Sequence, residues 1–309
     1  MPLPTIDTPT YELKLPSSNK KIKYRPFLVR EEKILILALE TKNEKDITNS
    51  VTDVLKKCIL TKGIDVDSLP TFDIEYIFLN IRAKSIGEDI RMTVTCPDDG
   101  QTKVPITVYV DEIKVIKPKD HKIDIVLDDK MTLRMKYPSI NQFIENNFDV
   151  DDDPEDVVDK TFQVVADCID TVYTEEDAWD GKDFSSSEKL EFVEQLNSKQ
   201  YKEVEKLFAT MPKLSHTIEV VNPNTKEKGS VVLEGLADFF RVSIAREDLE
   251  SYYKINFSLM QYHKYSLTEL ENMMPWERDV YITLLQNYLE EQRLKQAQEE
   301  GARKAGFYG

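Results

Sequence analysis

Glycine is scarce in this sequence, at 9 of 309 residues, and histidine is scarcer, at 3. So few glycines leave few places to build a glycine-rich loop that cradles a phosphate, and no such motif occurs. His121, His216 and His263 stand near no serine or cysteine in a nucleophile-elbow or triad pattern. These absences argue against catalysis, and we predict no catalytic residues and no small-molecule substrate.

Cysteine is also rare, with three residues that lie far apart in the sequence. An odd number without paired spacing gives no disulfide framework and fits a reducing compartment. Cys58 and Cys168 fall on the apolar faces of predicted helices, where a reduced cysteine behaves as a small hydrophobic residue. We therefore predict a packing role for these two thiols.

The third cysteine begins a turn that looks like half of a zinc knuckle, Cys96-Pro-Asp-Asp-Gly100. A structural zinc site needs four Cys or His ligands at paired spacing. Asp99 stands where the second sulfur belongs, and a later turn has Asn222 and Thr225 at the corresponding places. Neither turn can hold zinc in the usual way, and an Asp-Gly turn can close a hairpin unaided. We predict no metal ligands and no cofactor.

Long hydrophobic runs are missing as well. No window approaches the roughly 18 consecutive apolar residues of a membrane span. The first residues, Met1-Pro-Leu-Pro-Thr5, do not form the basic region and apolar run of a secretory signal. We therefore expect a protein that is cytosolic where it is made and has no membrane partner.

Basic residues are outnumbered, with 41 Lys and Arg against 57 Asp and Glu and a formal net charge of −16. Nucleic acid is therefore not expected as a direct partner, because phosphate contacts need a basic stripe. The acidity has two interpretations. It keeps the chain soluble, or it steers the chain onto a basic protein surface in a salt-sensitive association.

The acidic charge is densest between Asp149 and Asp159. A calcium loop of the EF-hand kind needs a glycine at its turn and a glutamate about twelve residues from its start. Here the glycine is missing and Pro154 interrupts the segment, so we interpret these acids as helix capping and solvation at a subdomain boundary. A metal-dependent hydrolase that uses them is a separate hypothesis, which metal analysis of the purified protein would test.

Alternating β-branched residues around polar turns predict two similar β-hairpins, at 91–110 and 215–233. Shorter alternating stretches predict a hairpin at 10–28 and a strand pair through 123–126 and 133–137. Apolar spacing predicts three helices in the first half: one from about Val29, one with apolar residues from Ile47 to Ile59 on one face, and one from near Phe72. Helix starts in the second half are marked by capping pairs or prolines: Ser139 with Gln142, Asp153 with Pro154, Ser185 with Glu188, Ser266 with Glu269, and Pro275.

These elements predict an α+β fold with two subdomains, each a β-hairpin or small antiparallel sheet packed with helices. The N-terminal α+β subdomain spans 1–140 and holds the hairpin at 91–110. The second spans 141–309, is mainly helical and holds the hairpin at 215–233. Residues 290–309 form a polar tail, which is either a solvated helix that frays or a segment that orders on a partner.

Aromatic residues are concentrated in the last third of the chain. Either most of these rings belong to the core, or some face outward as an interface hot spot, where Tyr and Trp are enriched. Because short, closely spaced helices cannot bury every ring, we expect a mixture. The candidate interface residues are Tyr252, Tyr253, Trp276, Tyr281 and Tyr288.

Several segments resemble the baseplate hub subunit of contractile-tailed phages of the T-even type and related hub-assembly proteins. They are Tyr24–Lys33, Leu69–Tyr76, Arg82–Gly87, Cys96–Gly100, Met211–Leu214, Leu233–Phe240 and Met274–Arg278. The resemblance covers nearly the whole chain, and its motifs are structural. Some members of that family carry cysteine pairs in the hairpins, and this chain does not, which argues against a family zinc site here.

The resemblance implies a late structural protein of the virion, located in the tail baseplate and in the host cytoplasm during assembly. The implied partners are other baseplate hub and central spike proteins, the tape-measure protein or the tail tube initiator. Two hypotheses follow: a hub component retained in the finished tail, or an assembly chaperone that binds hub proteins transiently and leaves. Both predict that the protein is not an enzyme.

Overall fold

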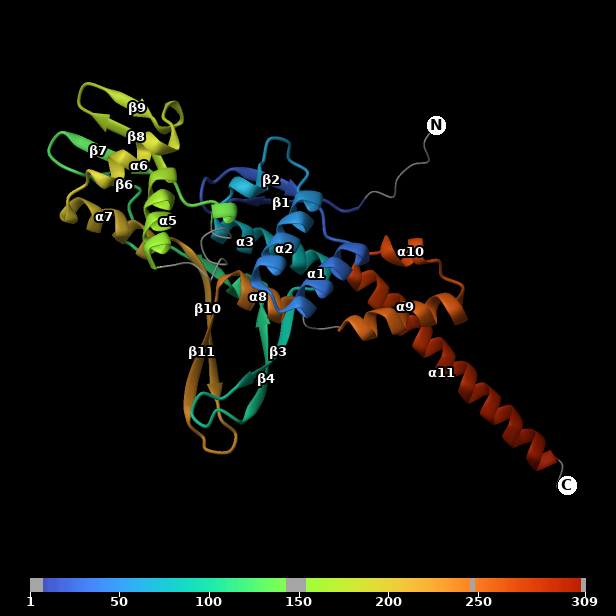
Figure 1. The fold of residues 1–309 in the computed structure, drawn as a ribbon. Helices are drawn as coiled ribbons and strands as arrows, with labels where there is room; N and C mark the ends of the chain where they lie inside the picture. The colour runs from blue at the N-terminus through green and yellow to red at the C-terminus, as the bar shows by residue number, and fades with distance from the viewer. Residues whose placement is uncertain (1–7, 143–153, 245–247, 307–309) are drawn as a thin grey trace, which may run out of the picture.

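The computed structural model describes residues 8–142, 154–244 and 248–306 (Figure 1). The described chain is an α+β protein with small antiparallel sheets and a mainly helical C-terminal part, which confirms the predicted fold class. The strands are β1 (Tyr11–Lys14), β2 (Lys21–Tyr24), β3 (Asp89–Thr95), β4 (Lys103–Tyr109), β5 (Lys114–Ile116), β6 (Asp124–Val126), β7 (Met131–Met135), β8 (Ile169–Thr174), β9 (Ala178–Asp180), β10 (Lys213–Val221) and β11 (Lys228–Glu234).

The helices are interspersed with these strands up to β11, and from α8 onward the described elements are all helices. The α-helices are α1 (Val29–Thr41), α2 (Glu44–Cys58), α3 (Thr71–Ser85), α5 (Pro154–Asp167), α6 (Ser186–Glu194), α7 (Ser198–Ala209), α8 (Gly235–Ile244), α9 (Leu249–His263), α10 (Leu267–Glu271) and α11 (Pro275–Gly306). Short 3₁₀ helices are η1 (Val66–Ser68), η2 (Val110–Glu112) and η3 (Gly181–Asp183).

All strand pairs are antiparallel. β1 pairs with β2, β3 pairs with β4, and the remaining strands form a sheet of order β11-β10-β5 and a sheet of order β6-β7-β8-β9. The hairpins expected at 10–28, 91–110 and 215–233 are therefore present, as is the strand pair of β6 and β7. β5, β8 and β9 were not among the predicted strands.

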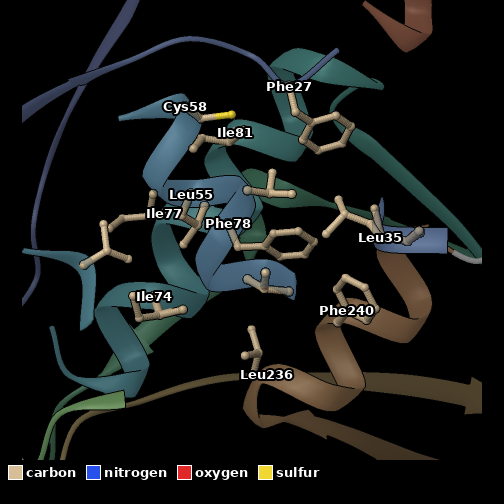
Figure 2. Close-up of a cluster of buried hydrophobic side chains, with 14 of the residues drawn as sticks. Phe27, Leu35, Leu55, Cys58, Ile74, Ile77, Phe78, Ile81, Leu236 and Phe240 are labelled. Carbon is tan, nitrogen blue, oxygen red and sulfur yellow. The ribbon is translucent and has the colours of Figure 1, made fainter. Parts of the chain in front are cut away.

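The first core lies among α1, α2, α3 and α8 and is covered on one side by the β1-β2 hairpin. Phe78 of α3 packs against Phe240 of α8, with ring centroids 5.5 Å apart (Figure 2). Cys58 is fully buried in the same core, and burial raises the pKa of its thiol to about 12. Its predicted packing role is therefore confirmed.

Two further cores lie within the part of the chain that the structure describes. The second joins β6, β7 and β8 to α5, α6 and α7 in a separate lobe of Figure 1. The third lies where the β3-β4 and β10-β11 hairpins meet α3 and α8. The buried residues of the second core lie between 125 and 207, and those of the third lie between 79 and 239. The predicted division at residue 140 stays a prediction.

Buried polar residues of α3 connect these parts. Arg82 donates to the carbonyl oxygens of Gly87 and Asp89, at 2.6 and 2.9 Å, and so fixes the entry to β3. Asp73 accepts hydrogen bonds from the backbone N–H and the hydroxyl of Ser17, in the β1-β2 turn. These residues belong to segments that the sequence singled out, and their role is to position neighbouring elements.

The predicted helix starts are well reproduced. Capping boxes form at Ser185 with Glu188 and at Ser266 with Glu269, and the Ser139–Gln142 pair makes both reciprocal hydrogen bonds. α5 begins at Pro154, while Asp153 and the acidic residues before it lie outside the described residues. The interpretation of that acidic segment stays a prediction.

Candidate interface on the C-terminal helices

A buried polar cluster attaches the C-terminal helices to the body. Arg278 of α11 and Glu32 of α1 each leave about 1% of the side chain exposed, and their nearest N and O atoms are 3.5 Å apart. The Arg278 guanidinium also lies 5.4 Å from the ring centroid of Tyr252 on α9. Because an arginine favours the face of an aromatic ring, this residue joins three helices at one point.

Backbone contacts add to this attachment. The N–H of Val29 donates to the carbonyl oxygen of Met273 at 2.9 Å, and Arg30 donates to the Asn272 side chain at 2.7 Å. The Glu277 carboxylate accepts from the Met274 N–H at 2.9 Å, which caps the start of α11. The first turns of α11 are therefore fixed in position by the residues that precede them.

The five predicted interface residues divide into one buried ring and four exposed ones. Tyr252 is 1% exposed, and burial raises the pKa of its hydroxyl to about 12, with a further increase from Glu271. Tyr253, Trp276, Tyr281 and Tyr288 are each at least 42% exposed. Tyr252 therefore supports the helices from within, and the other four rings are accessible from outside.

Exposed apolar side chains on α11 recur at every fourth residue. Trp276, Val280, Leu284 and Tyr288 are 42–59% exposed, and four-residue spacing puts them along one side of the helix. We call these four residues the α11 row. Tyr281 lies beside it and is also exposed. Val280 and Leu284 were not among the predicted interface residues, although their spacing from Trp276 is visible in the sequence.

A second set of exposed apolar residues lies on α9. Tyr253, Phe257 and Met260 are spaced by four and three residues and so share a side of that helix. Lys33 of α1 lies over the Tyr253 ring, with its Nζ 5.4 Å from the centroid. We call these three residues the α9 row. An apolar row that the described part of the chain leaves exposed is typical of a protein-binding surface.

The turn of the β3-β4 hairpin, which resembles half of a zinc knuckle, contacts the turn of the β10-β11 hairpin. The side-chain amide of Asn222 donates to Asp98 at 3.0 Å and to Asp99 at 2.9 Å, and the Thr225 hydroxyl donates to Asp98 at 2.6 Å. We call this contact the tip junction (Figure 1). Direct hydrogen bonds therefore connect positions that a zinc knuckle would connect through metal.

The hydrogen bonds at the tip junction also set its electrostatics. Donation from Thr225 and then from Asn222 lowers the pKa of Asp98. The hydroxyl of Thr102 and backbone N–H groups lower the pKa of Asp99. Gly229 completes the fit, because a Cβ there would lie 2.5 Å from the Pro97 ring. The junction is thus a closely packed, polar contact between the β3-β4 and β10-β11 hairpins.

Among the residues that the structure describes, no group of three or more His, Cys, Asp or Glu side chains is arranged to hold a metal ion. Within 8–142, 154–244 and 248–306, no helix combines the length and apolar character that a membrane span requires. The candidate site is the pair of exposed rows, because their apolar side chains lie at the surface of α9 and α11.

Comparison with protein families gives two matches that divide the chain. The model described as T4 bacteriophage base plate protein matches residues 8–241, and the model described as baseplate hub assembly protein Gp51 C-terminal domain matches residues 244–289. The chain belongs to the T4 baseplate protein family, since the first match covers well over half of its length. A search of curated proteins gave no match, and neither did a search of solved structures.

The boundary between the two matches separates the C-terminal helices from the rest of the chain. It falls in the last turn of α8, so the second match contains α9, α10 and the first half of α11. The α9 row and the α11 row both lie inside it. Arg278 and Glu32 pair across the two matched regions. The part of the chain related to a hub assembly protein is therefore the part with the exposed apolar rows.

Proposed function

We propose that this protein is a structural component of the phage tail baseplate hub, retained in the finished contractile tail, that acts through protein–protein contacts. The observation that supports it most is the α11 row, four apolar side chains that remain 42–59% exposed among the described residues. Aromatic residues and methionine are enriched at the centres of protein interfaces, where they contribute most of the binding energy.

The proposed partners are other baseplate hub and central spike proteins, the tape-measure protein or the tail tube initiator. The net charge of −16 disfavours self-association and favours partners with a basic surface. The proposed role needs no catalytic group, because initiation of an assembly requires only binding energy. We therefore propose a non-enzymatic late protein that meets its partners in the host cytoplasm and remains in the virion.

A second candidate function is a transient assembly chaperone that leaves before the tail is complete. The match of residues 244–289 to a hub assembly domain favours it. Exposed helical rows on a stable body would suit temporary capture of a partner helix as well as a permanent joint.

Copy number in the particle distinguishes the two. Quantitative mass spectrometry of purified particles, with peptides from a major tail protein as the internal standard, measures how much of this chain is retained. A fixed stoichiometric amount is expected for a hub component. A trace amount in particles, together with abundant protein in the infected-cell lysate, would overturn retention and favour the chaperone.

A further inference from the structure

A second apolar feature lies far from the C-terminal helices, in the lobe of the β6-β7-β8-β9 sheet. It is a cavity of about 430 Å³ between this sheet and α6. Met131, Ile169 and Val172 of β7 and β8 line it from the sheet, and Phe192 lines it from α6. Its volume is in the range of pockets that hold a few side chains or a small ligand.

Two aromatic side chains stand at the mouth of this cavity. Trp179 of β9 is 40% exposed, and Phe184, just after η3, is 38% exposed. Gly181 allows the segment between β9 and α6 to pass close to β8, because a Cβ at this position would lie 2.5 Å from the carbonyl oxygen of Ile169. The chain therefore fixes two large apolar groups at the surface beside an apolar cavity.

The cavity adjoins an open sheet edge. β9 is the last strand in the order β6-β7-β8-β9, and among the described residues it pairs with β8 alone (Figure 1). The N–H of Thr174 donates to the carbonyl oxygen of Asp177, so alternation along the antiparallel pair directs the backbone groups of Trp179 toward β8. The N–H and C=O groups of Ala178 and Asp180 then point away from β8, toward the open edge.

The surroundings of this edge are strongly acidic. Between residues 170 and 194 the chain has nine Asp or Glu and two Lys residues. Glu188, Lys189 and Glu191 line the cavity itself, and Glu175, Glu176 and Asp177 form the turn between β8 and β9. Such an edge repels a second copy of itself, because the same negative charges would face each other. It attracts an extended segment with basic side chains.

We propose that the groove between β9 and α6 binds an extended, basic segment of a partner protein. The segment adds as a strand to the edge of β9, with one apolar side chain in the cavity against Trp179 and Phe184. Lysines or arginines on either side of that anchor meet the acidic rim. Backbone hydrogen bonds supply affinity in this mode of recognition, and the pocket and the charges supply specificity.

The test uses the full chain with Trp276→Phe. The sequence has two tryptophans, so Trp179 is then the single one that remains. The probe is the synthetic peptide KTKVLVKTK, which places its leucine and its lysines on the same side of an extended strand. Two comparison peptides replace every lysine by glutamate or the leucine by serine. The readout is the emission of Trp179 during titration, repeated with added salt.

We expect the lysine–leucine peptide to bind at least about tenfold more tightly than either comparison peptide, and added salt to weaken it. Ala178→Pro removes an N–H donor from the open edge and should weaken binding by a similar factor, as should Phe184→Ala. The matched control is Val126→Pro, on β6 at the opposite edge of the same sheet, where the same alternation directs the N–H outward. It should leave binding unchanged.

Circular dichroism and thermal unfolding confirm that each variant is folded before titration. No change in Trp179 emission with the basic peptide, or equal binding of the acidic peptide, would overturn the proposal. So would equal effects of the two proline variants. A response to the apolar dye Nile red without a response to the peptide would assign the cavity to a small ligand instead. A dependence of Trp179 emission on protein concentration alone would assign it to a second copy.

Discussion

Asn222 shows how a single buried side chain connects two distant parts of this chain. Its amide N–H₂ group is the donor between the carboxylates of Asp98 and Asp99, at the end of the other hairpin. The sequence indicated both turns, because each has the polar residues and spacing of a tight loop. It did not indicate that they meet, since 124 residues separate Asn222 from Asp98.

Replacing Asn222 by aspartate tests this contact with little change in shape. The new carboxylate has no hydrogen to donate and adds a third negative charge, so we expect a loss of about 1–3 kcal/mol in the free energy of unfolding. Chemical denaturation at neutral pH measures it. Adding Asp98→Asn to the variant should recover part of the loss. Equal stability of the Asn222→Asp variant and the unmodified protein would show that the tip junction contributes nothing.

Glu75 gives the fold a dependence on pH. It is buried on α3, and burial raises the pKa of its carboxyl to about 8, although backbone N–H groups of Leu214 and Leu236 oppose the increase. A carboxyl with a raised pKa in the folded state contributes most below its ordinary pKa of about 4.5. That contribution is lost as the pH rises from there through about 8.

The neutral variant Glu75→Gln should therefore resemble the unmodified protein at pH near 5 and exceed its stability above pH 8. The expected gain is at least about 1.4 kcal/mol, the equivalent of one pKa unit. Denaturant titrations across this pH range measure the difference, with Glu40→Gln on the exposed side of α1 as the control. A constant difference at all pH values would contradict the account of Glu75.

Individual elements were predicted well where their signals are local. Capping boxes at Ser185 and Ser266 mark helix starts because the hydrogen bonds they predict span only three residues. The pair of β8 and β9 was missed because Ile169–Thr174 lacks the strict apolar–polar alternation that marks a half-buried strand. The exposed face of α9 was also beyond prediction. Tyr252 and Tyr253 are adjacent, and only the docking of α9 decides which one is buried.

The attachment of α11 depends on Arg278. We expect Arg278→Met to reduce the free energy of unfolding by about 3 kcal/mol, because it takes a positive charge away from the buried Glu32. Denaturant unfolding and limited proteolysis between α8 and α11 measure the effect. Arg293→Met, farther along the same helix where the side chain is 80% exposed, is the matched control and should cost little.

Substitutions in and beside the α11 row should affect partner binding, whereas substitutions in the buried cluster around Arg278 should affect stability. Trp276→Ala combined with Tyr281→Ala should leave the thermal midpoint within a few degrees and weaken partner binding by at least about tenfold. Co-purification of baseplate proteins from infected cells measures binding. Tyr262→Ala, an exposed ring of α9 outside both rows, is the control. Loss of folding without a separate binding defect would place the two rings in the core.

At the scale of the whole molecule, three cores form a body from which the second half of α11 projects (Figure 1). The segments that resemble a baseplate hub family predicted the family to which the chain belongs. Sequence alone could not predict the cavity beside Trp179, because its walls come from four separate elements. The result is an acidic body with two candidate binding surfaces, the helical rows of α9 and α11 and the groove of β9 and α6.

The central claim is that the exposed rows of α9 and α11 contact other baseplate proteins. Cross-linking mass spectrometry of assembled baseplates tests it most directly, since Lys254, Lys264 and Lys295 lie on or beside these helices. We predict that these lysines cross-link to other baseplate proteins more often than lysines elsewhere on the body. The claim would be contradicted if only lysines on the rest of the body cross-linked to other proteins. The three lysines would then also remain accessible to an amine-reactive reagent in the assembled baseplate.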